Sequence, residues 1–284
     1  MIDLPPVPFA LGMFSVSGSP PFATLVFDDG AAVSLHSVRA LALDIGLSLP
    51  HGGVFDLVQD WERGFAALVR LVHALAYEER GAGHRSHFVA EDFLKAERLL
   101  PESRQIIRLR EDGPRVLPVT VQGAASSKLA LGADMRSASA NLCLGAVVGR
   151  MCRHADRESA RTAIAGWTLA TEIVRADQQG HARLAAPGSL VLGPLFVPAA
   201  FAGALEGIAS MLALTGAPFA RGDLGVLAAT ASAGIAALSN DGLLVPGDVI
   251  IAGPEPSAET PAAEFVDVIE AMAPGFGRQM ISLV

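Results

Sequence analysis

Glu172 is the residue whose surroundings most clearly call for a chemical explanation. It lies within the apolar segment 167–173, which reads W-T-L-A-T-E-I. A carboxylate in such surroundings needs a cationic partner, a metal ion or a proton, because burial penalises its charged form. An arginine is the simplest partner, and Arg175 and Arg183 follow closely in the sequence.

Three histidines are the other candidates for chemistry. His84 and His87 are spaced i, i+3, which can ligate a metal, but no cluster of acids or cysteines lies beside them in the sequence. His181 is the only candidate acid or base in its region. A solvated loop is the simpler interpretation for all three.

The segments around Glu172 predict a strand, a helix and a second strand. Apolar residues fill segments 142–148 and 167–173. Between them, Asp156 is a plausible N-cap and Gly166 a plausible stop. Elsewhere the pattern predicts short strands within residues 1–35 and 200–220. It predicts helices over residues 37–46, 56–80, 91–100 and 223–238.

Four runs of sequence carry a resemblance to a known family. From Asn141 the chain reads N-L-C-L-G-A-V-V-G-R, from Gly166 G-W-T-L-A-T-E, from Gly193 G-P-L-F-V-P, and from Leu243 L-L-V-P-G-D-V-I-I-A-G. In this order they resemble the runs E-x-E-L-A-V-V-I-G-R, G-Y-T-(V/I)-x-N-D, G-P-(W/F)-I-V-P and L-x-P-G-D-(V/L)-I-x-T-G of the fumarylacetoacetate hydrolase superfamily.

The resemblance implies a β-rich mixed α/β roll with flanking helices. A small N-terminal region of β-sheet and helices, residues 1–102, would precede a C-terminal domain of catalytic type, residues 103–284. Members of the superfamily usually form homodimers. They cleave or rearrange 2-oxo acids and β-dicarbonyl compounds through an enolate held on a metal.

The residues that would carry this chemistry differ here. Three carboxylates of the family's magnesium site correspond to Asn141, Cys143 and Glu172, so the ligand charge falls from −3 to −1 if the thiol stays protonated. We therefore expect a degenerate metal site and no cofactor, with magnesium or manganese only if the site is retained after all. A zinc site from Cys143 and Glu172, joined by His154 or His181, is the functional alternative to a buried thiol and an ion-paired acid.

Other family positions have changed as well. A strand resembling R-Q-I-F-C-A-G-x-N-Y normally leads to a histidine and a glutamate that activate water, whereas this chain continues from Arg104 as R-Q-I-I-R-L-R. No histidine occurs between His87 and His154. The family's first lysine corresponds to Gln122. The lid is short, so Arg183 is the candidate anion anchor there.

Two hypotheses follow for the function. The first is a divergent, metal-independent enzyme acting on a small 2-oxo acid or β-dicarbonyl compound by C–C hydrolysis, decarboxylation, tautomerisation or cyclisation. Glu172 would be the base, Arg183 and Gln122 the oxyanion partners, and His181 a further catalytic candidate. The second is an inactive pseudoenzyme that serves as a binding or dimerisation module.

Composition narrows the class of protein. The 284 residues are 51% hydrophobic and 18% charged, with a net charge of −8, which argues against disorder and against nucleic-acid binding. The two cysteines fit a reducing cytosol, and the N-terminus shows no signal peptide, so we expect a cytoplasmic protein. The most apolar window, residues 188–216, contains prolines and glycines that favour buried strands over a membrane-spanning helix.

Overall fold

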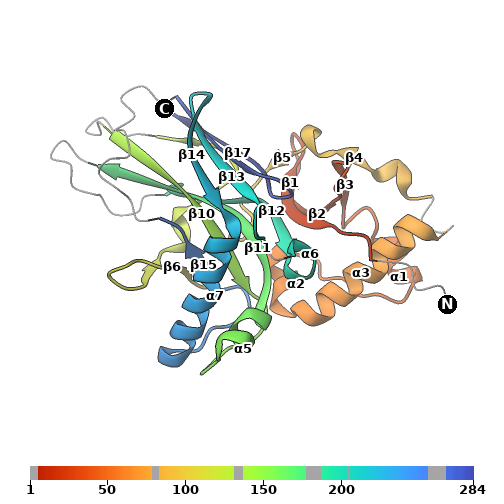
Figure 1. The fold of residues 1–284 in the computed structure, drawn as a ribbon. Coiled ribbons are helices and arrows are strands. Elements are labelled where there is room, and N and C mark those ends of the chain that lie inside the picture. The colour runs from red at the N-terminus through yellow and green to blue at the C-terminus, as the bar shows by residue number, and fades with distance from the viewer. Residues whose placement is uncertain (1–5, 79–82, 131–136, 177–186, 204, 255–266) are drawn as a thin grey trace.

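A computed structural model describes residues 6–78, 83–130, 137–176, 187–203, 205–254 and 267–284 of the chain. Two β-sheets dominate these residues, and helices flank them (Figure 1). The fold is thus the β-rich mixed α/β architecture that the sequence predicts. No described helix combines the length and the apolar character needed to cross a bilayer.

The larger sheet has twelve strands in the order β4-β3-β2-β1-β12-β11-β10-β15-β6-β7, with β5 on β1 and β8 on β12. These strands are β1 Ala10–Ser15, β2 Phe22–Val26, β3 Ala31–Ser34, β4 Val89–Ala90, β5 Lys95–Ala96, β6 Ile106–Arg108, β7 Arg115–Leu117, β8 Gln122–Gly123, β10 Ser137–Val148, β11 Ile164–Ala176, β12 Leu190–Pro198 and β15 Val249–Ala252. The N-terminal strands therefore continue the sheet that β10, β11 and β12 form, through the antiparallel pairing of β1 with β12.

The second sheet has five strands in the order β14-β13-β16-β17-β9. They are β9 Ser126–Leu129, β13 Ala209–Leu214, β14 Ala217–Asp223, β16 Val268–Ala273 and β17 Gly277–Leu283. The helices are α1 Arg39–Asp44, α2 Val54–Gln59, α3 Trp61–Tyr77, α5 Arg157–Thr162, α6 Ala199–Ala202 and α7 Leu224–Asp241, with 3-10 turns η1 Arg85–His87, η2 Glu91–Phe93 and η3 Val119–Val121.

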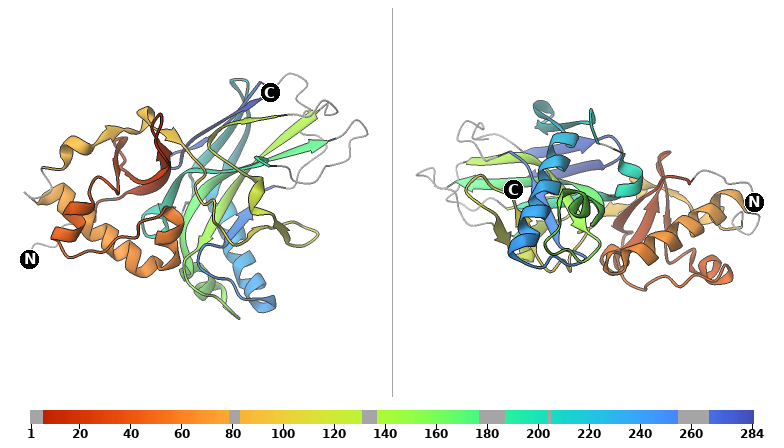
Figure 2. Two further views of the ribbon diagram at one scale, coloured as in Figure 1. Left: turned by 180° about the vertical axis from the view of Figure 1, so that it is seen from behind. Right: turned by 60° about the horizontal axis from the view of Figure 1, so that its bottom comes forward.

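Two hydrophobic cores lie on opposite faces of the larger sheet. One face carries Leu142, Leu144 and Ile250, which pack with α7 and the second sheet. The other carries Cys143, Ala170 and Phe196, which pack with the helices of the N-terminal region. Side chains alternate between the faces along each strand, so Asn141, Cys143 and Glu172 belong to the second face. Figure 2 shows the N-terminal helices and α7 on different sides of the long strands.

The capping prediction at Asp156 is confirmed. Its carboxylate accepts a hydrogen bond from Ser159 N, and α5 begins at the next residue. The helix ends earlier than predicted, because residues from Ile164 already pair with β10. Helix α7 likewise begins after its cap, Asp223.

Two helix predictions in the N-terminal region need correction. The helix expected over residues 56–80 is divided into α2 and α3 at Asp60, whose backbone torsions (φ −131°, ψ 63°) are not helical. The helix expected over residues 91–100 does not form. A single 3-10 turn is followed by β5, because Lys95 and Ala96 pair with β1 and this long-range pairing outweighs local preference.

The described residues of the apolar window 188–216 form β12, the short helix α6 and the whole of β13. All nine residues of β12 are buried. The strands expected there are therefore present, whereas α6 was not expected. The boundary at residue 102 between two domains stays a prediction.

Candidate functional site

A transverse row of side chains crosses the centre of the larger sheet. Asn141 on β10 lies opposite Glu172 on β11, which lies opposite Leu190 on β12, which in turn lies beside Gln122 on β8. Directly paired residues place their side chains on the same face of a sheet. Backbone pairing alone therefore gathers three of the predicted site residues, Asn141, Glu172 and Gln122, in one row.

Glu172 is held between two arginines from the neighbouring segment 108–110. Arg108 Nε donates to Glu172 Oε2 at 3.1 Å, and Arg110 Nη2 donates to Glu172 Oε1 at 2.6 Å. The side chains of Glu172 and Arg108 are 9% and 0% exposed. The prediction that this buried acid needs a cationic partner is confirmed, and Arg108 and Arg110 are such partners. Of the two arginines named from the sequence, Arg183 and the side chain of Arg175 lie outside the described part of the chain.

Other N–H groups of Arg108 donate hydrogen bonds to backbone carbonyls. Nη1 donates to Leu109 O at 2.6 Å and to Gly253 O at 3.3 Å, and Nη2 donates to Pro254 O at 2.6 Å. A guanidinium has five N–H groups, and four of them are used by these bonds and the one to Glu172. Arg108 therefore ties Glu172 to the end of β15 and has little left with which to bind a ligand.

Asn141, by contrast, has a side-chain hydrogen-bond donor that is unused among the described residues. Its side chain is buried, with 6% of the residue exposed, and its Nδ2 group has no hydrogen-bond partner. A buried amide that lacks an acceptor costs about 1–3 kcal/mol. An acceptor oxygen at this position would remove that cost, and Asn141 lies directly opposite Glu172.

Cys143 is a fully buried thiol on the same face. Burial raises its pKa to about 12, an effect larger than the opposing influence of Arg108. A β-carbon at Gly253 would lie 2.3 Å from Cys143 Sγ, so the thiol packs directly on the backbone there. These contacts agree with the interpretation of Cys143 as a small hydrophobic residue.

Gln122 is engaged by the backbone of Leu100. Its Oε1 accepts from Leu100 N at 3.2 Å, and its Nε2 donates to Leu100 O at 3.1 Å. Both ends of the amide thus hold the segment that leads from the N-terminal region to β6. Its predicted role as an oxyanion partner is untested, and this pairing gives it a structural role.

The donor set does not fit a divalent metal. Magnesium and manganese prefer several charged oxygen ligands. Here Asn141 is neutral, Cys143 is protonated at neutral pH, and both oxygens of Glu172 accept from arginines. Among the described residues, no group of three His, Cys, Asp or Glu side chains gathers to hold a metal.

The remaining candidates are placed as follows. His181 and Arg183 lie outside the described residues, and of Arg175 only the backbone, in β11, is described. His154 is exposed in the segment before α5, with a positive φ of 50°. The rings of His84 and His87 lie 5.7 Å apart beside η1.

Sequence reasoning missed Arg108 and Arg110. The available signal was the run R-L-R, in which two charged residues with strand spacing follow the apolar start of β6. By the sequence resemblance, they correspond to the small residues of the family's run C-A-G. Small residues would leave space for a ligand, whereas Arg108 fills its position with a buried side chain.

Comparisons with known proteins agree with this fold. Residues 113–283, more than half of the chain, match the family model described as fumarylacetoacetate (FAA) hydrolase C-terminal. A search of curated protein sequences found no match.

Solved structures extend the likeness over almost the whole chain. Maleylpyruvate hydrolase from Sphingobium sp. SYK-6 is similar with a TM-score of 0.73 and 18% identity, covering 97% of this chain and 99% of that one. Its complex with manganese(II) and pyruvate has a TM-score of 0.71 and 17% identity, with 97% and 98% covered. A probable 2-hydroxyhepta-2,4-diene-1,7-dioate isomerase from Mycobacterium abscessus has a TM-score of 0.65 and 18% identity, with 96% and 98% covered. At these identities the likeness establishes the fold, and together with the family model it shows that the chain belongs to the fumarylacetoacetate hydrolase family.

Proposed function

We propose that the chain is a metal-independent member of this family that binds the anion of a small 2-oxo acid or β-dicarbonyl compound at the Asn141–Glu172 row. The observation that carries the proposal is the buried, unpartnered Nδ2 group of Asn141 at a position where the family has a carboxylate ligand. An N–H donor is suited to a ligand oxygen rather than to a cation.

The arginines likewise add hydrogen-bond donors to a site that has acceptors in the family. Where the family surrounds a cation with carboxylates, this chain has the guanidinium groups of Arg108 and Arg110 on Glu172. Guanidinium and amide donors stabilise negative charge on oxygen through charge-assisted hydrogen bonds. We assign Asn141 to the ligand oxygen and Arg110, the more exposed of the two arginines, to the anion's side of the cluster.

Glu172 then acts as a positioning residue. Its carboxylate holds both guanidinium groups in place, which is a different role from that of a general base. Arg183 and His181 remain candidates for an anion anchor and a proton donor, and Gln122 for an oxyanion partner.

The reaction class follows from what the chain retains. Hydrolysis of a C–C bond needs an activated water, and the segment from Arg104 lacks the histidine that the family uses for this purpose. Tautomerisation, decarboxylation and cyclisation need no activated water. Each needs a stabilised enolate-like oxygen and a group that gives or takes the transferred proton, for which His181 or solvent water is the candidate. We therefore favour these reactions over hydrolysis for this chain.

The test is ligand binding and turnover after treatment with a chelator. Pyruvate, oxaloacetate and acetylpyruvate would be titrated into metal-free protein by calorimetry, and enol-to-keto conversion followed by ultraviolet absorbance. We expect binding that is unchanged by added magnesium or manganese. Asn141→Leu should weaken it on the order of tenfold, because one hydrogen bond to a charged group is lost.

Asn240→Leu is the matched control, because Asn240 is an exposed residue near the end of α7. Equal affinity of the Asn141→Leu and wild-type proteins, or binding that requires a metal, would contradict the proposal.

A specific observation favours a second candidate, the pseudoenzyme. Arg108 uses four donors within the protein, and Gln122 uses both ends of its amide on Leu100, so two residues of the row hold the scaffold together. Binding of an oxo acid without turnover, or no binding at all, would support this alternative.

The assembly and the cellular location of the protein are further proposals. We infer a homodimer from the family's usual behaviour, with the small-residue helix α7 as a candidate contact. A cytoplasmic protein fits the pair of free, buried cysteines, Cys143 and Cys152.

A further inference from the structure

A cavity of about 690 Å³ lies in the N-terminal region, away from the Asn141–Glu172 row. Its walls come from β1, β2, the end of β3, the segments around α1 and before α2, and the turn at residues 99–102. None of the residues of the row lines it. The volume lies within the usual range for small-molecule sites, about 300–1,000 Å³.

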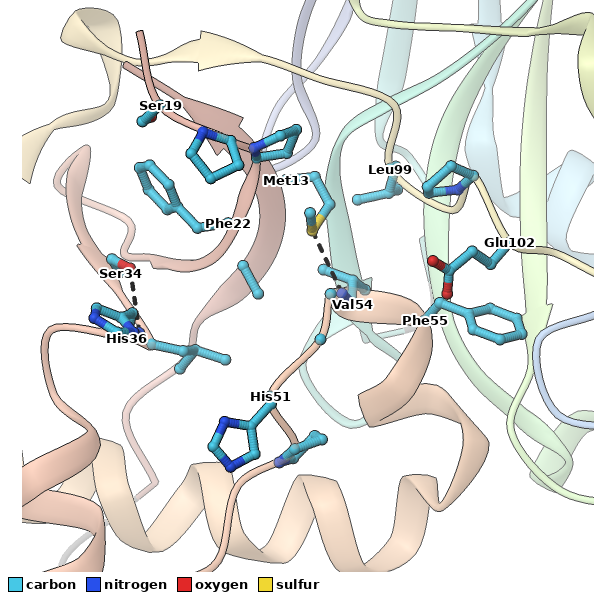
Figure 3. A pocket seen from close by; sticks show the side chains of 18 of the residues that line it. Met13, Ser19, Phe22, Ser34, His36, His51, Val54, Phe55, Leu99 and Glu102 are labelled. Carbon is cyan, nitrogen blue, oxygen red and sulfur yellow. Dashed lines mark hydrogen bonds between the residues drawn. The ribbon is translucent and has the colours of Figure 1, made fainter. Parts of the chain in front are cut away.

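Much of the cavity wall is apolar. Met13, Phe22, Leu35, Val54 and Leu99 contribute side chains, and Met13 Sδ accepts a hydrogen bond from Val54 N at 3.5 Å. Figure 3 shows Met13 and Leu99 on the wall between His36 on one side and Glu102 on the other. This surface suits the hydrocarbon body of a ligand.

Arg39 supplies a cation to the same cavity. Its Nη2 donates to Pro50 O at 2.7 Å, and its Nη1 contacts the imidazole of His51, with 3.0 Å to Nε2. Its Nε is buried and has no hydrogen-bond partner. Among the described residues Arg39 makes no ion pair, so a partly buried guanidinium lines a cavity without a carboxylate on it.

The charged residues around the cavity favour a ligand with one negative charge over a ligand with two. Arg39 contacts His51, and Glu102 is the acid among the lining residues. Figure 3 shows His36 and Glu102 on opposite sides of the cavity. A single carboxylate near Arg39 would satisfy the guanidinium. A second negative group reaching the far side would meet Glu102 and be repelled, so a monocarboxylate fits better than a dicarboxylate.

We propose that this cavity is a second ligand site, which binds a small monocarboxylic acid with an apolar or aromatic body, its carboxylate on Arg39 and His51 and its body against Met13, Phe22 and Leu35. This site is independent of the proposed oxo-acid site. It uses residues of the N-terminal region and of the turn that leads from it.

The test uses the full chain with 3-phenylpropionate as the probe and 3-phenylpropanamide as its neutral counterpart. Binding would be measured by calorimetry, and the site located by protection of His36 and His51 from a histidine-modifying reagent. We expect the carboxylate to bind more tightly than the amide and than phenylsuccinate, a dicarboxylate of similar size.

Two variants distinguish the effect of the positive charge of Arg39 from the effect of its hydrogen bond to the backbone. Arg39→Gln, which keeps an amide donor for Pro50 O, should weaken binding of the carboxylate on the order of tenfold and leave binding of the amide unchanged. Arg70→Gln is the matched control, because Arg70 also donates to a backbone carbonyl of this region, Ile45 O, but does not line the cavity. It should bind as the wild-type protein does.

Several results would overturn the proposal. They are equal affinity for the acid and its amide, equal weakening by Arg39→Gln and Arg70→Gln, or absence of binding by every probe. A loss of binding in Asn141→Leu would place the probe in the other site and would also contradict the proposal.

Discussion

The two ends of the paired strands β10 and β11 differ in what determines their residues. At one end, close packing leaves no room for a side chain, which requires glycine. A β-carbon on Gly166 would lie 2.4 Å from Val197 O and 2.6 Å from the ring of Phe196, and one on Gly149 would lie 2.5 Å from Ala165 Cβ. Toward the other end, the Asn141–Glu172 row is polar, and the arginine partners of Glu172 come from β6 and the residues just after it.

The difference shows how such a fold changes its chemistry. A glycine forced by close backbone packing can be replaced only if several neighbours move. A polar row can be exchanged when its charges are replaced together. By the sequence resemblance, Asn141 and Cys143 correspond to carboxylates of the family, and Arg108 and Arg110 to small residues. The scaffold therefore stays recognisable where the site does not.

The largest expected effect comes from removing Arg108. Arg108→Ala leaves the Glu172 carboxylate buried with half of its ion pairs and frees the carbonyls of Gly253 and Pro254. We expect a loss of about 3–5 kcal/mol in the free energy of unfolding, measured with urea. Arg115→Ala is the control, because the Arg115–Asp112 pair is more than half exposed on both sides, and it should cost less than about 1 kcal/mol. Similar losses in the two variants would mean that the cluster is not a buried ion pair.

A double-mutant cycle sharpens the same point. Arg108→Met and Glu172→Leu each leave a charged partner behind, whereas the double variant removes the pair together. We expect the double variant to be more stable than the sum of the single losses predicts, by about 0.5–3 kcal/mol. Strict additivity in urea unfolding would show that Arg108 and Glu172 do not interact.

The packing end of the strands is tested by Gly166→Ala. The added methyl group meets Val197 O and Phe196, and we expect a loss of about 1–3 kcal/mol in thermal or urea unfolding. Gly242→Ala is the control, because nothing lies within 4 Å of a β-carbon there and the backbone is extended (φ −158°). A neutral Gly166→Ala variant would remove the contrast between the two ends.

The smallest effect concerns pH. Burial raises the pKa of Asp248, although its carboxylate accepts from Val245 N and Gln105 Nε2. With the folded-state pKa above the unfolded one, its stabilising contribution is complete below the unfolded pKa and is lost as pH rises through the folded one. We therefore expect the wild-type protein to exceed Asp248→Asn in free energy of unfolding by more at pH 4 than at pH 8. Urea unfolding of both proteins at each pH measures this difference. A parallel pH dependence of the two proteins would contradict this cause.

The sequence predicted the elements whose signals are local. The apolar runs of β10 and β11, the cap at Asp156 and the start of α7 all depend on neighbouring residues, and all are present. The helix expected over residues 91–100 failed because β5 pairs with β1, about 80 positions away in the sequence.

The site was predictable only in part. That Glu172 needs a cationic partner follows from its apolar surroundings. The identity of the partner did not follow, because Arg108 is 64 positions away in the sequence and reaches Glu172 through the packing of β6 on β15. The position of Gln122 in the row likewise depends on its pairing with β12.

Metal content is the measurement that tests the central claim most directly. The purified protein would be dialysed in turn against magnesium, manganese and zinc, freed of excess ion, and analysed by mass spectrometry. Because Arg108 and Arg110 occupy both oxygens of Glu172, we predict that the protein retains far less than one metal ion per chain with each of the three. One retained ion per chain, lost in the Glu172→Gln variant, would contradict the account and restore a metal-dependent site at Asn141, Cys143 and Glu172.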